Sequence, residues 1–222
     1  MIELARLLRW VAAGAMAGSL AGSGADKPTT IDLPKPRLTG PMSLEQAINQ
    51  RRSVREFAKD PLTREQLGQL CWAAQGMTDA RRGFRAAPSA GALYPLEIYL
   101  VTPDGLFHYK PSGHKLERLD AKDLRTPLYR AALEQAWIAG APATMVITAV
   151  VQRTAAKYGD RAPRYCLLET GHAAQNVLLQ AVALGLGAVP VGAFHDQRVR
   201  ELLHLPGDQN VFYLIAIGQP AE

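Results

Sequence analysis

Residues 165–184 read YCLLETGHAAQNVLLQAVAL, which is the longest helical pattern in the chain. Between Ala173 and Leu184 this pattern is apolar on almost every side. A helix of that kind has to be buried, either in the core of its own subunit or against another subunit. We therefore expect the rest of the fold to be arranged around residues 165–184.

Short runs of β-branched and apolar residues lie before and after this helix in the sequence, and they predict strands. The run from Thr144 to Val151, TMVITAVV, is continuous and indicates a strand buried on both faces. A turn at Pro103-Asp104-Gly105 should join two other runs into a hairpin. The five predicted strands are Glu97–Thr102, Leu106–Tyr109, Thr144–Val151, Ala188–Val191 and Phe212–Ile217.

Helix-start signals predict where the other helices begin. Ser43 and Thr63 each open a capping box, and the two helices should end near Arg52 and Gly76. A third helix is predicted over residues 124–137, and Asp196 should cap a fourth. The pattern therefore predicts an α+β domain, with a central sheet of about five strands surrounded by helices.

Composition excludes several classes of protein. The chain has 222 residues, of which 48% are hydrophobic and 20% charged, and this suits one globular domain. The two cysteines are too few for a disulfide framework, and neither they nor the five histidines have metal-ligand spacing. The net charge of +5 is spread along the chain, so it favours a small anionic ligand over nucleic acid. No apolar run reaches the length of about eighteen residues that a transmembrane span needs.

The N-terminal segment differs in character from the rest. Early arginines, an apolar stretch up to Ala21 and small residues up to Ala25 follow the layout of a secretory signal. We predict a signal peptide over residues 1–25, an extended arm over 26–41 and the main domain over 42–222. A cleaved signal would make the protein periplasmic or exported, whereas a retained N-terminal tail would leave it cytoplasmic.

Three segments have suitable residues for a binding site. RRSVREF, from Arg51, places three arginines and a serine at a helix end, where guanidinium groups can bind a phosphate. PSAGA, from Pro88, has small residues that let a flat ligand approach the backbone. GLGAVPVGAF, from Gly185, lacks dinucleotide-binding spacing but can present backbone N–H groups. The plainer alternatives are a solvated basic helix end and generic loops. Since GxSxG, P-loop and HExxH motifs are all missing, the three segments predict a site for an anionic, planar ligand.

Read in order, four motifs resemble the nitroreductase family. They are RRSVREF from Arg51, PLTREQLGQLCWAAQG from Pro61, APSAGALYPLEIYLV from Ala87, and KYGDRAPRYCLLETGHAAQNVLLQAVALGLGAVPVGAF from Lys157. With the closing FYLIAIGQP they cover the chain from Ser43 to its end. Within the family, the motifs resemble the SagB-type dehydrogenase branch, which includes azoline oxidases of thiazole- and oxazole-modified peptides.

The resemblance implies a fold, a cofactor and an assembly. Nitroreductases have an α+β fold with a mixed, mainly antiparallel sheet, and they bind FMN at the interface of a homodimer. They move electrons between NAD(P)H and an acceptor by a ping-pong route. By position, the FMN phosphate and ribityl contacts would be Arg51, Arg52, Ser53 and Arg55. The loop along the isoalloxazine ring would be Pro88, Ser89, Ala90, Gly91 and Ala92, and the turn facing flavin N5 would be Pro190, Val191, Gly192 and Ala193.

Two further features bear on the reaction. Lys157-Tyr158 resembles the pair to which azoline-oxidising members assign proton removal, with lysine as general base and the phenol as relay; the alternative is an exposed pair of no consequence. The chain also lacks the basic C-terminal residues that close over the phosphate in many nitroreductases. Phosphate binding would then depend on the cluster at Arg51, with Arg81, Arg82 or Arg85 as helpers.

The sequence therefore predicts an FMN-dependent oxidoreductase that acts as a homodimer on a small-molecule or peptide substrate, with no metal and no nucleic-acid partner. Two alternatives stay open. One is an azoline peptide oxidase that uses FMN and oxygen. The other is a non-catalytic, flavin-binding partner subunit.

Overall fold

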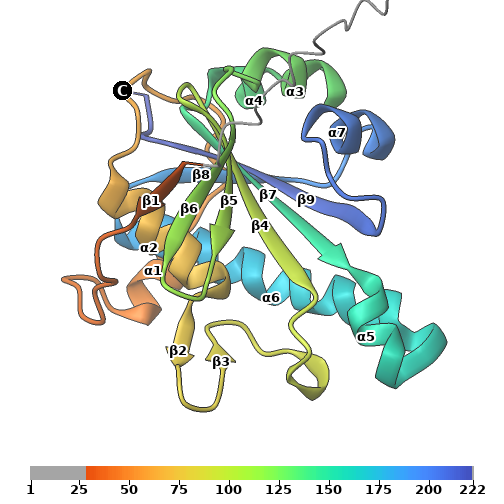
Figure 1. Cartoon of the computed structure of the whole chain (residues 1–222). Coiled ribbons are helices and arrows are strands. Elements are labelled where there is room, and N and C mark those ends of the chain that lie inside the picture. The colour runs from red at the N-terminus through yellow and green to blue at the C-terminus, as the bar shows by residue number, and fades with distance from the viewer. Residues whose placement is uncertain (1–28, 222) are drawn as a thin grey trace, which may run out of the picture.

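A computed structural model describes residues 29–221, so the predicted signal peptide of residues 1–25 lies outside the described residues. At its centre is a seven-stranded sheet with the order β1-β6-β5-β4-β7-β9-β8, in which all neighbouring strands are antiparallel (Figure 1). Its strands are β1 (Thr30–Asp32), β4 (Leu96–Thr102), β5 (Gly105–Lys110), β6 (Lys115–Asp120), β7 (Ala143–Val150), β8 (Gly187–Val191) and β9 (Gln209–Gly218). A separate hairpin consists of β2 (Met77–Asp79) and β3 (Phe84–Arg85).

The sheet has more strands than the five that the sequence predicted. All five predicted strands are present, and the two additional strands, β1 and β6, pair with each other at one edge. β6 reads KLERLD and is mostly half-exposed, so it lacks the apolar run that marks a strand buried on both faces. The sheet is mainly antiparallel, as the resemblance implied. Among residues 29–221, the only parallel pairing is an isolated bridge between Ser53 and Ala188.

Helices cover the sheet, and two of them begin as the sequence predicted. At Ser43 and at Thr63 both reciprocal hydrogen bonds of a capping box are present. In the described part of the chain the α-helices are α1 (Leu44–Gln50), α2 (Arg64–Gln75), α3 (Arg125–Ala131), α4 (Ala136–Gly140), α5 (Val151–Tyr158), α6 (Ala162–Ala183) and α7 (Asp196–Leu202).

Two helix predictions were wrong in detail, and one helix was missed. The helix predicted over residues 124–137 is interrupted, because Leu133 and Glu134 have φ angles of 56° and 55° and separate α3 from α4. Asp196 is the first residue of α7 rather than its cap; His195 holds the cap position and makes no side-chain capping bond. Helix α5 was not predicted, since it follows β7 directly and has no capping side chain at Val150.

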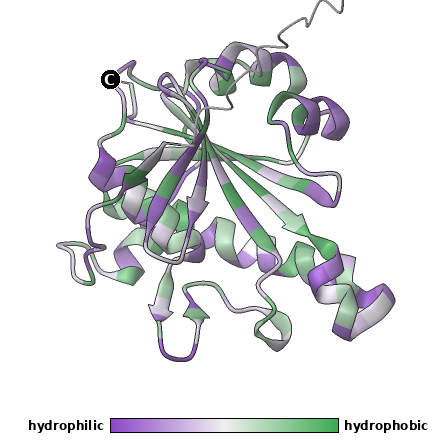
Figure 2. Cartoon of the chain, in the orientation of Figure 1, coloured by the Kyte–Doolittle hydropathy of each residue, from purple (hydrophilic) through white to green (hydrophobic). Residues whose placement is uncertain are grey.

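The sheet separates two hydrophobic cores. On one face, Ile98 and Leu100 of β4 pack into a core with α2 and α6; on the other, Tyr99 and Val101 pack with α3, α4 and α7. Figure 1 shows these two groups of helices on opposite sides of the strands. All eight residues of β7 are buried, as the run TMVITAVV predicted. Figure 2 shows the hydrophobic colour concentrated on the central strands β4 and β7.

Helix α6 is buried along one side only. Ala173, Ala174, Val177 and Ala181 contribute to the core beneath the sheet. On the outer side, Leu167 and Leu168 remain more than half exposed, at 54% and 52%. The sequence predicted that this helix is buried either in the core or against another subunit. The single chain shows the burial in the core only. No helix among residues 29–221 is both long enough and apolar enough to cross a membrane.

A buried glutamine attaches the segment before α1 to the domain. Gln69 of α2 is 7% exposed. Its Oε1 accepts the N–H of Arg37 at 2.9 Å, and its Nε2 donates to the carbonyl of Arg37 at 3.0 Å and to Oε1 of Gln180 at 3.1 Å. The residue therefore connects this segment both to α2 and to α6.

Replacing Gln69 with leucine should lower the free energy of unfolding by about 2 kcal/mol, because the polar groups of Arg37 and Gln180 would lose their partner in a partly buried place. Chemical denaturation measures the change. The matched control is Gln197→Leu on α7, where the glutamine is exposed and bonds only to Glu201; it should change stability by less than about 0.5 kcal/mol. Equal effects of the two substitutions would contradict the role given to Gln69.

Candidate functional site

The arginine segment lies beside the edge strand β8. After α1 the chain is extended; Ser53 bridges to Ala188, and the N–H of Val54 donates to the carbonyl of Ala188 at 3.1 Å. Gly187 makes this approach possible, because a Cβ there would lie 2.7 Å from Cβ of Val54. Two of the three predicted binding segments, RRSVREF from Arg51 and GLGAVPVGAF from Gly185, are therefore neighbours at Gly187 and Ala188, although they are far apart in the sequence.

Within the part of the chain that the structure describes, the three arginines of this segment have no acidic partner. Within residues 29–221, none of Arg51, Arg52 and Arg55 forms a salt bridge. Arg52 donates to the carbonyls of Asn49 and Arg51 at 2.8 Å, which stabilises the end of α1, and Arg55 lies over the ring of Trp137 at 5.2 Å. Ser53 is exposed. Unpaired positive charge beside a free hydroxyl suits an anion.

The turn after β8 presents backbone donors at the other end of the same strand. Pro190 and Val191 belong to β8, and Gly192 and Ala193 follow as exposed residues. Among residues 29–221, no acceptor is found for the N–H groups of Gly192 and Ala193. The turn is held from the other side, because Gln135 Nε2 donates to the carbonyl of Ala193 at 2.8 Å. Two free N–H groups are therefore available to a ligand at this edge.

The loop at Pro88 is held in an unusual backbone conformation. Gly91, Ala92 and Tyr94 have φ angles of 62°, 54° and 48°. Ser89 Oγ accepts the N–H of Tyr94 at 2.8 Å, and Glu169 Oε1 of α6 accepts the N–H of Ala90 at 2.9 Å. Left-handed conformations are costly for residues other than glycine, so these contacts are needed to keep the loop in place.

Lys157 and Tyr158, the candidate catalytic pair, lie against this loop. They form the last turn of α5. A Cβ on Gly91 would lie 3.1 Å from Nζ of Lys157 and 3.0 Å from the hydroxyl of Tyr158. The Tyr158 ring also contacts Tyr165 edge-on, with 5.0 Å between the ring centres. The structure thus brings Lys157 and Tyr158 together with the loop, and Gly91 leaves the space for them.

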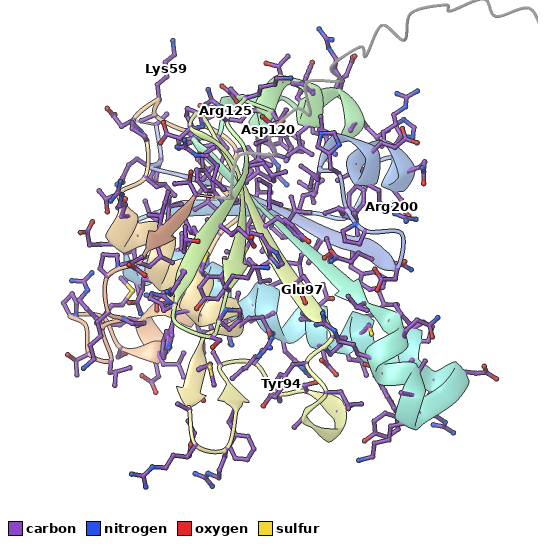
Figure 3. All side chains as sticks on the ribbon, in the orientation of Figure 1. Lys59, Tyr94, Glu97, Asp120, Arg125 and Arg200 are labelled. Carbon is purple, nitrogen blue, oxygen red and sulfur yellow. The ribbon has the colours of Figure 1, made fainter. Side chains whose placement is uncertain are left out.

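Sequence reasoning missed the side chains that attach the loop to the sheet. Arg153, one turn before Lys157 on α5, donates to the carbonyl of Tyr94 at 3.2 Å and pairs with Glu97 at 2.6 Å. Figure 3 labels Tyr94 in the loop and Glu97 on β4. Glu97 also contacts His108 at 2.7 Å. Burial raises the pKa of Glu97, but the bonds to His108 and Arg153 together hold it below its ordinary value. Arg153 and Lys157 are four residues apart, and this spacing would have pointed to Arg153 if helix α5 had been predicted.

Two of the predicted helper arginines have partners elsewhere. Arg82 pairs with Asp79 at 2.7 Å within the hairpin. Arg85 lies over the ring of Tyr94 at 4.7 Å, and its own N–H donates to the Tyr94 hydroxyl at 3.2 Å. Both side chains therefore belong to the hairpin and loop rather than to the arginine cluster at residues 51–55.

The candidate residues form two sets within one chain. Residues 51–55 and 190–193 lie at β8, whereas residues 88–92, Lys157 and Tyr158 lie where β4 begins. β9 and β7 separate β8 from β4, so the two strands are about 14 Å apart across the sheet. The three predicted segments therefore do not meet at one point on the single chain.

Replacing Gly91 with alanine should displace Lys157 and Tyr158. Gly83 is the matched control: its φ is 72°, close to the 62° of Gly91, but no atom lies within 4 Å of its Cβ position. Both alanine variants should lose about 1 kcal/mol of stability from backbone strain. Only Gly91→Ala should shift the NMR signal of ¹³C-methylated Lys157. The same Lys157 spectrum in both variants would contradict this placement.

Comparison with known proteins agrees with this architecture. The profile of the nitroreductase family matches residues 48–219. A provisionally named nitroreductase of Methanocaldococcus jannaschii is 46% identical over 187 residues, which is 82% of this chain and 93% of the relative. A crystal structure from Ralstonia eutropha, also provisionally named a nitroreductase, superposes with a TM-score of 0.79 at 31% identity and covers 87% of this chain and 90% of that one.

Two further similarities concern chemistry. An NADPH:FMN oxidoreductase from Vibrio harveyi, solved in complex with NAD⁺, has a TM-score of 0.61 at 26% identity; the match covers 81% of this chain and 69% of that one. The microcin B17-processing protein of Escherichia coli is 27% identical over 133 residues, which is 54% of this chain and 48% of the relative.

Proposed function

Because the chain belongs to the nitroreductase family and has its fold, we propose that it is an FMN-dependent oxidoreductase. It transfers a hydride from a reduced nicotinamide to an acceptor by a ping-pong route. The observation that carries this proposal is the edge strand β8. Three arginines that have no acidic partner among residues 29–221 lie in the segment beside its start, and the free N–H groups of Gly192 and Ala193 follow its end. The similarity to an NADPH:FMN oxidoreductase supports the choice of cofactor.

The residues present suit an FMN molecule. Arg51, Arg52, Ser53 and Arg55 would hold its phosphate and ribityl chain through charged and hydroxyl hydrogen bonds. The free N–H groups at Gly192 and Ala193 would face the ring, and the small residues of the loop at Pro88 would lie along it. When bound, FMN would supply a ring that accepts and releases a hydride. The protein would orient that ring and keep space beside it for a substrate.

We further propose that the site is completed in a homodimer. On one chain the arginine set and the loop set belong to strands about 14 Å apart, so a second copy could supply the loop to the first copy's arginines. An uncovered apolar surface supports this assembly. Leu44 and Ile48 of α1 and Leu167 and Leu168 of α6 are each more than half exposed. A groove of about 330 Å³ between α1, α2 and α6 is lined by Leu44, Trp72 and Leu179, among others.

An azoline peptide oxidase is the second candidate function. Lys157 and Tyr158 lie against the loop that would border the ring, and the similarity to the microcin-processing protein covers about half of each chain. In this reaction a thiazoline or oxazoline ring in a peptide loses two electrons and two protons. Lys157 and Tyr158 would remove one proton, and the second would leave with both electrons as a hydride that bound FMN would accept, with oxygen as the final electron acceptor.

Replacing Arg51 with alanine should weaken FMN binding at least tenfold, because a charged hydrogen bond to the phosphate contributes about 1.5–3 kcal/mol. Riboflavin, which has no phosphate, should bind the variant and the wild type equally. The measurement is quenching of flavin fluorescence during titration. Arg125→Ala is the control, since Arg125 already pairs with Asp123 at 2.6 Å. Equal FMN affinity for wild type and Arg51→Ala would contradict the assigned phosphate site.

Replacing Lys157 with alanine separates the two candidate reactions. If the chain oxidises azoline peptides, the variant should retain FMN and lose peptide oxidation by a factor of about 10² or more, because the general base is gone. If the chain uses only nicotinamide and a small acceptor, anaerobic flavin reduction by NAD(P)H should continue in the variant. Mass spectrometry measures peptide oxidation, in which the peptide loses two hydrogens. Stopped-flow absorbance measures the reduction of the flavin.

A further inference from the structure

Helix α6 contains a buried carboxylate without a strong cation beside it. Glu169 is 4% exposed and is the only charged residue among the buried residues of the range 29–221. Within that range it forms no salt bridge with a lysine or arginine. Its surroundings contain His172, one turn along the helix, and the thiol of Cys166. Burying a carboxylate in this way is costly unless hydrogen bonds compensate.

The compensating interactions come from the loop at Pro88. The N–H of Ala90 donates to Glu169 at 2.9 Å, and the Ser89 hydroxyl on the same loop favours the charged form of the carboxylate, which lowers its pKa. The same loop contains two of the six residues other than glycine with positive φ in the range 29–221, Ala92 and Tyr94. A strained loop keeps its shape only where surrounding contacts determine it. Glu169 supplies such a contact from the helix beneath.

The carboxylate also borders a depression of the surface. This pocket has a volume of about 270 Å³ and is lined by Pro88, Ser89 and Ala90 on the loop side and by Tyr165, Leu168, Glu169 and His172 of α6. Glu169 therefore lies at the side of the loop where this pocket leaves space for a bound molecule or for a second copy of the chain.

We propose that Glu169 is a positioning residue that holds the loop against the bound flavin, and that its negative charge lowers the flavin's reduction potential. This inference rests on the proposed function. A flavin becomes more negative when it accepts electrons, so a nearby carboxylate in a poorly solvated place disfavours the reduced form. The loop contact and the charge are separable by substitution. A glutamine at this position would retain an acceptor for the N–H of Ala90 and lose the charge, whereas a leucine would lose both.

The test compares Glu169→Gln, Glu169→Leu and the neighbouring control Thr170→Val in the full-length protein loaded with FMN. Thr170 is buried on the same helix and bonds only to the carbonyl of Cys166. Glu169→Gln should keep FMN affinity within threefold of wild type and raise the midpoint potential by about 30 mV or more, which corresponds to a tenfold change for a two-electron couple. Glu169→Leu should bind FMN at least tenfold more weakly, and Thr170→Val should match wild type.

A second readout does not depend on the flavin. Burial raises the pKa of Glu169 above its ordinary value, although Ala90 and Ser89 partly oppose the shift. The folded state therefore holds this proton more tightly than the unfolded state does. Stability from this group is present at low pH and is lost as the pH rises from the ordinary carboxyl pKa through the raised one. Thermal unfolding of Glu169→Gln without FMN should lack this decline.

The outcomes distinguish this inference from the proposed function. A wild type that takes up no FMN would refute the proposed function, and the role of Glu169 toward the flavin with it. A wild type that binds FMN, together with an unchanged potential in Glu169→Gln and unchanged affinity in Glu169→Leu, would refute the inference alone. Because Glu169→Gln preserves the size of the side chain, misfolding of the leucine variant would leave the potential measurement decisive.

Discussion

The packing of one face of α6 against the central sheet is the contact on which the other parts of the structure depend. Ala173, Ala174 and Val177 bring the helix close to the strands, and the end of the helix leads directly into β8. The same helix supports the loop at Pro88 through Glu169. The turn after β8 and the loop at Pro88 are therefore both attached to one helix that is buried along one side, and a shift of α6 would move them together.

The sequence predicted best where burial is complete. The run TMVITAVV identified β7 because both of its faces are covered. The edge strand β1 escaped prediction because it has only three residues. Its neighbour β6 escaped because charged residues at half-buried positions interrupt the apolar run. Helix α5 escaped because it continues directly from β7 without a capping residue. The break between α3 and α4 depends on positive φ at Leu133 and Glu134, two residues that rarely adopt it, so no local signal marked it.

The candidate site was predictable as separate motifs but not as an arrangement. The arginine motif and the GLGAVPVGAF segment are each visible in the sequence, whereas their contact depends on the pairing of Val54 with Ala188, which only the folded sheet brings about. Glu169 is a charged residue on a helix face that otherwise packs in the core. This conflict was the sign in the sequence that the residue has a special role. Arg153 and Glu97 gave no comparable sign, because an ion pair between α5 and β4 requires the tertiary structure.

The central claim is that these residues bind a flavin that a nicotinamide can reduce. The most direct measurement is the visible absorption spectrum of the FMN-loaded protein under anaerobic conditions, recorded before and after NADH or NADPH is added. The account predicts flavin absorption bands that disappear on addition and return when air is admitted. A colourless protein that takes up no added FMN would contradict the account.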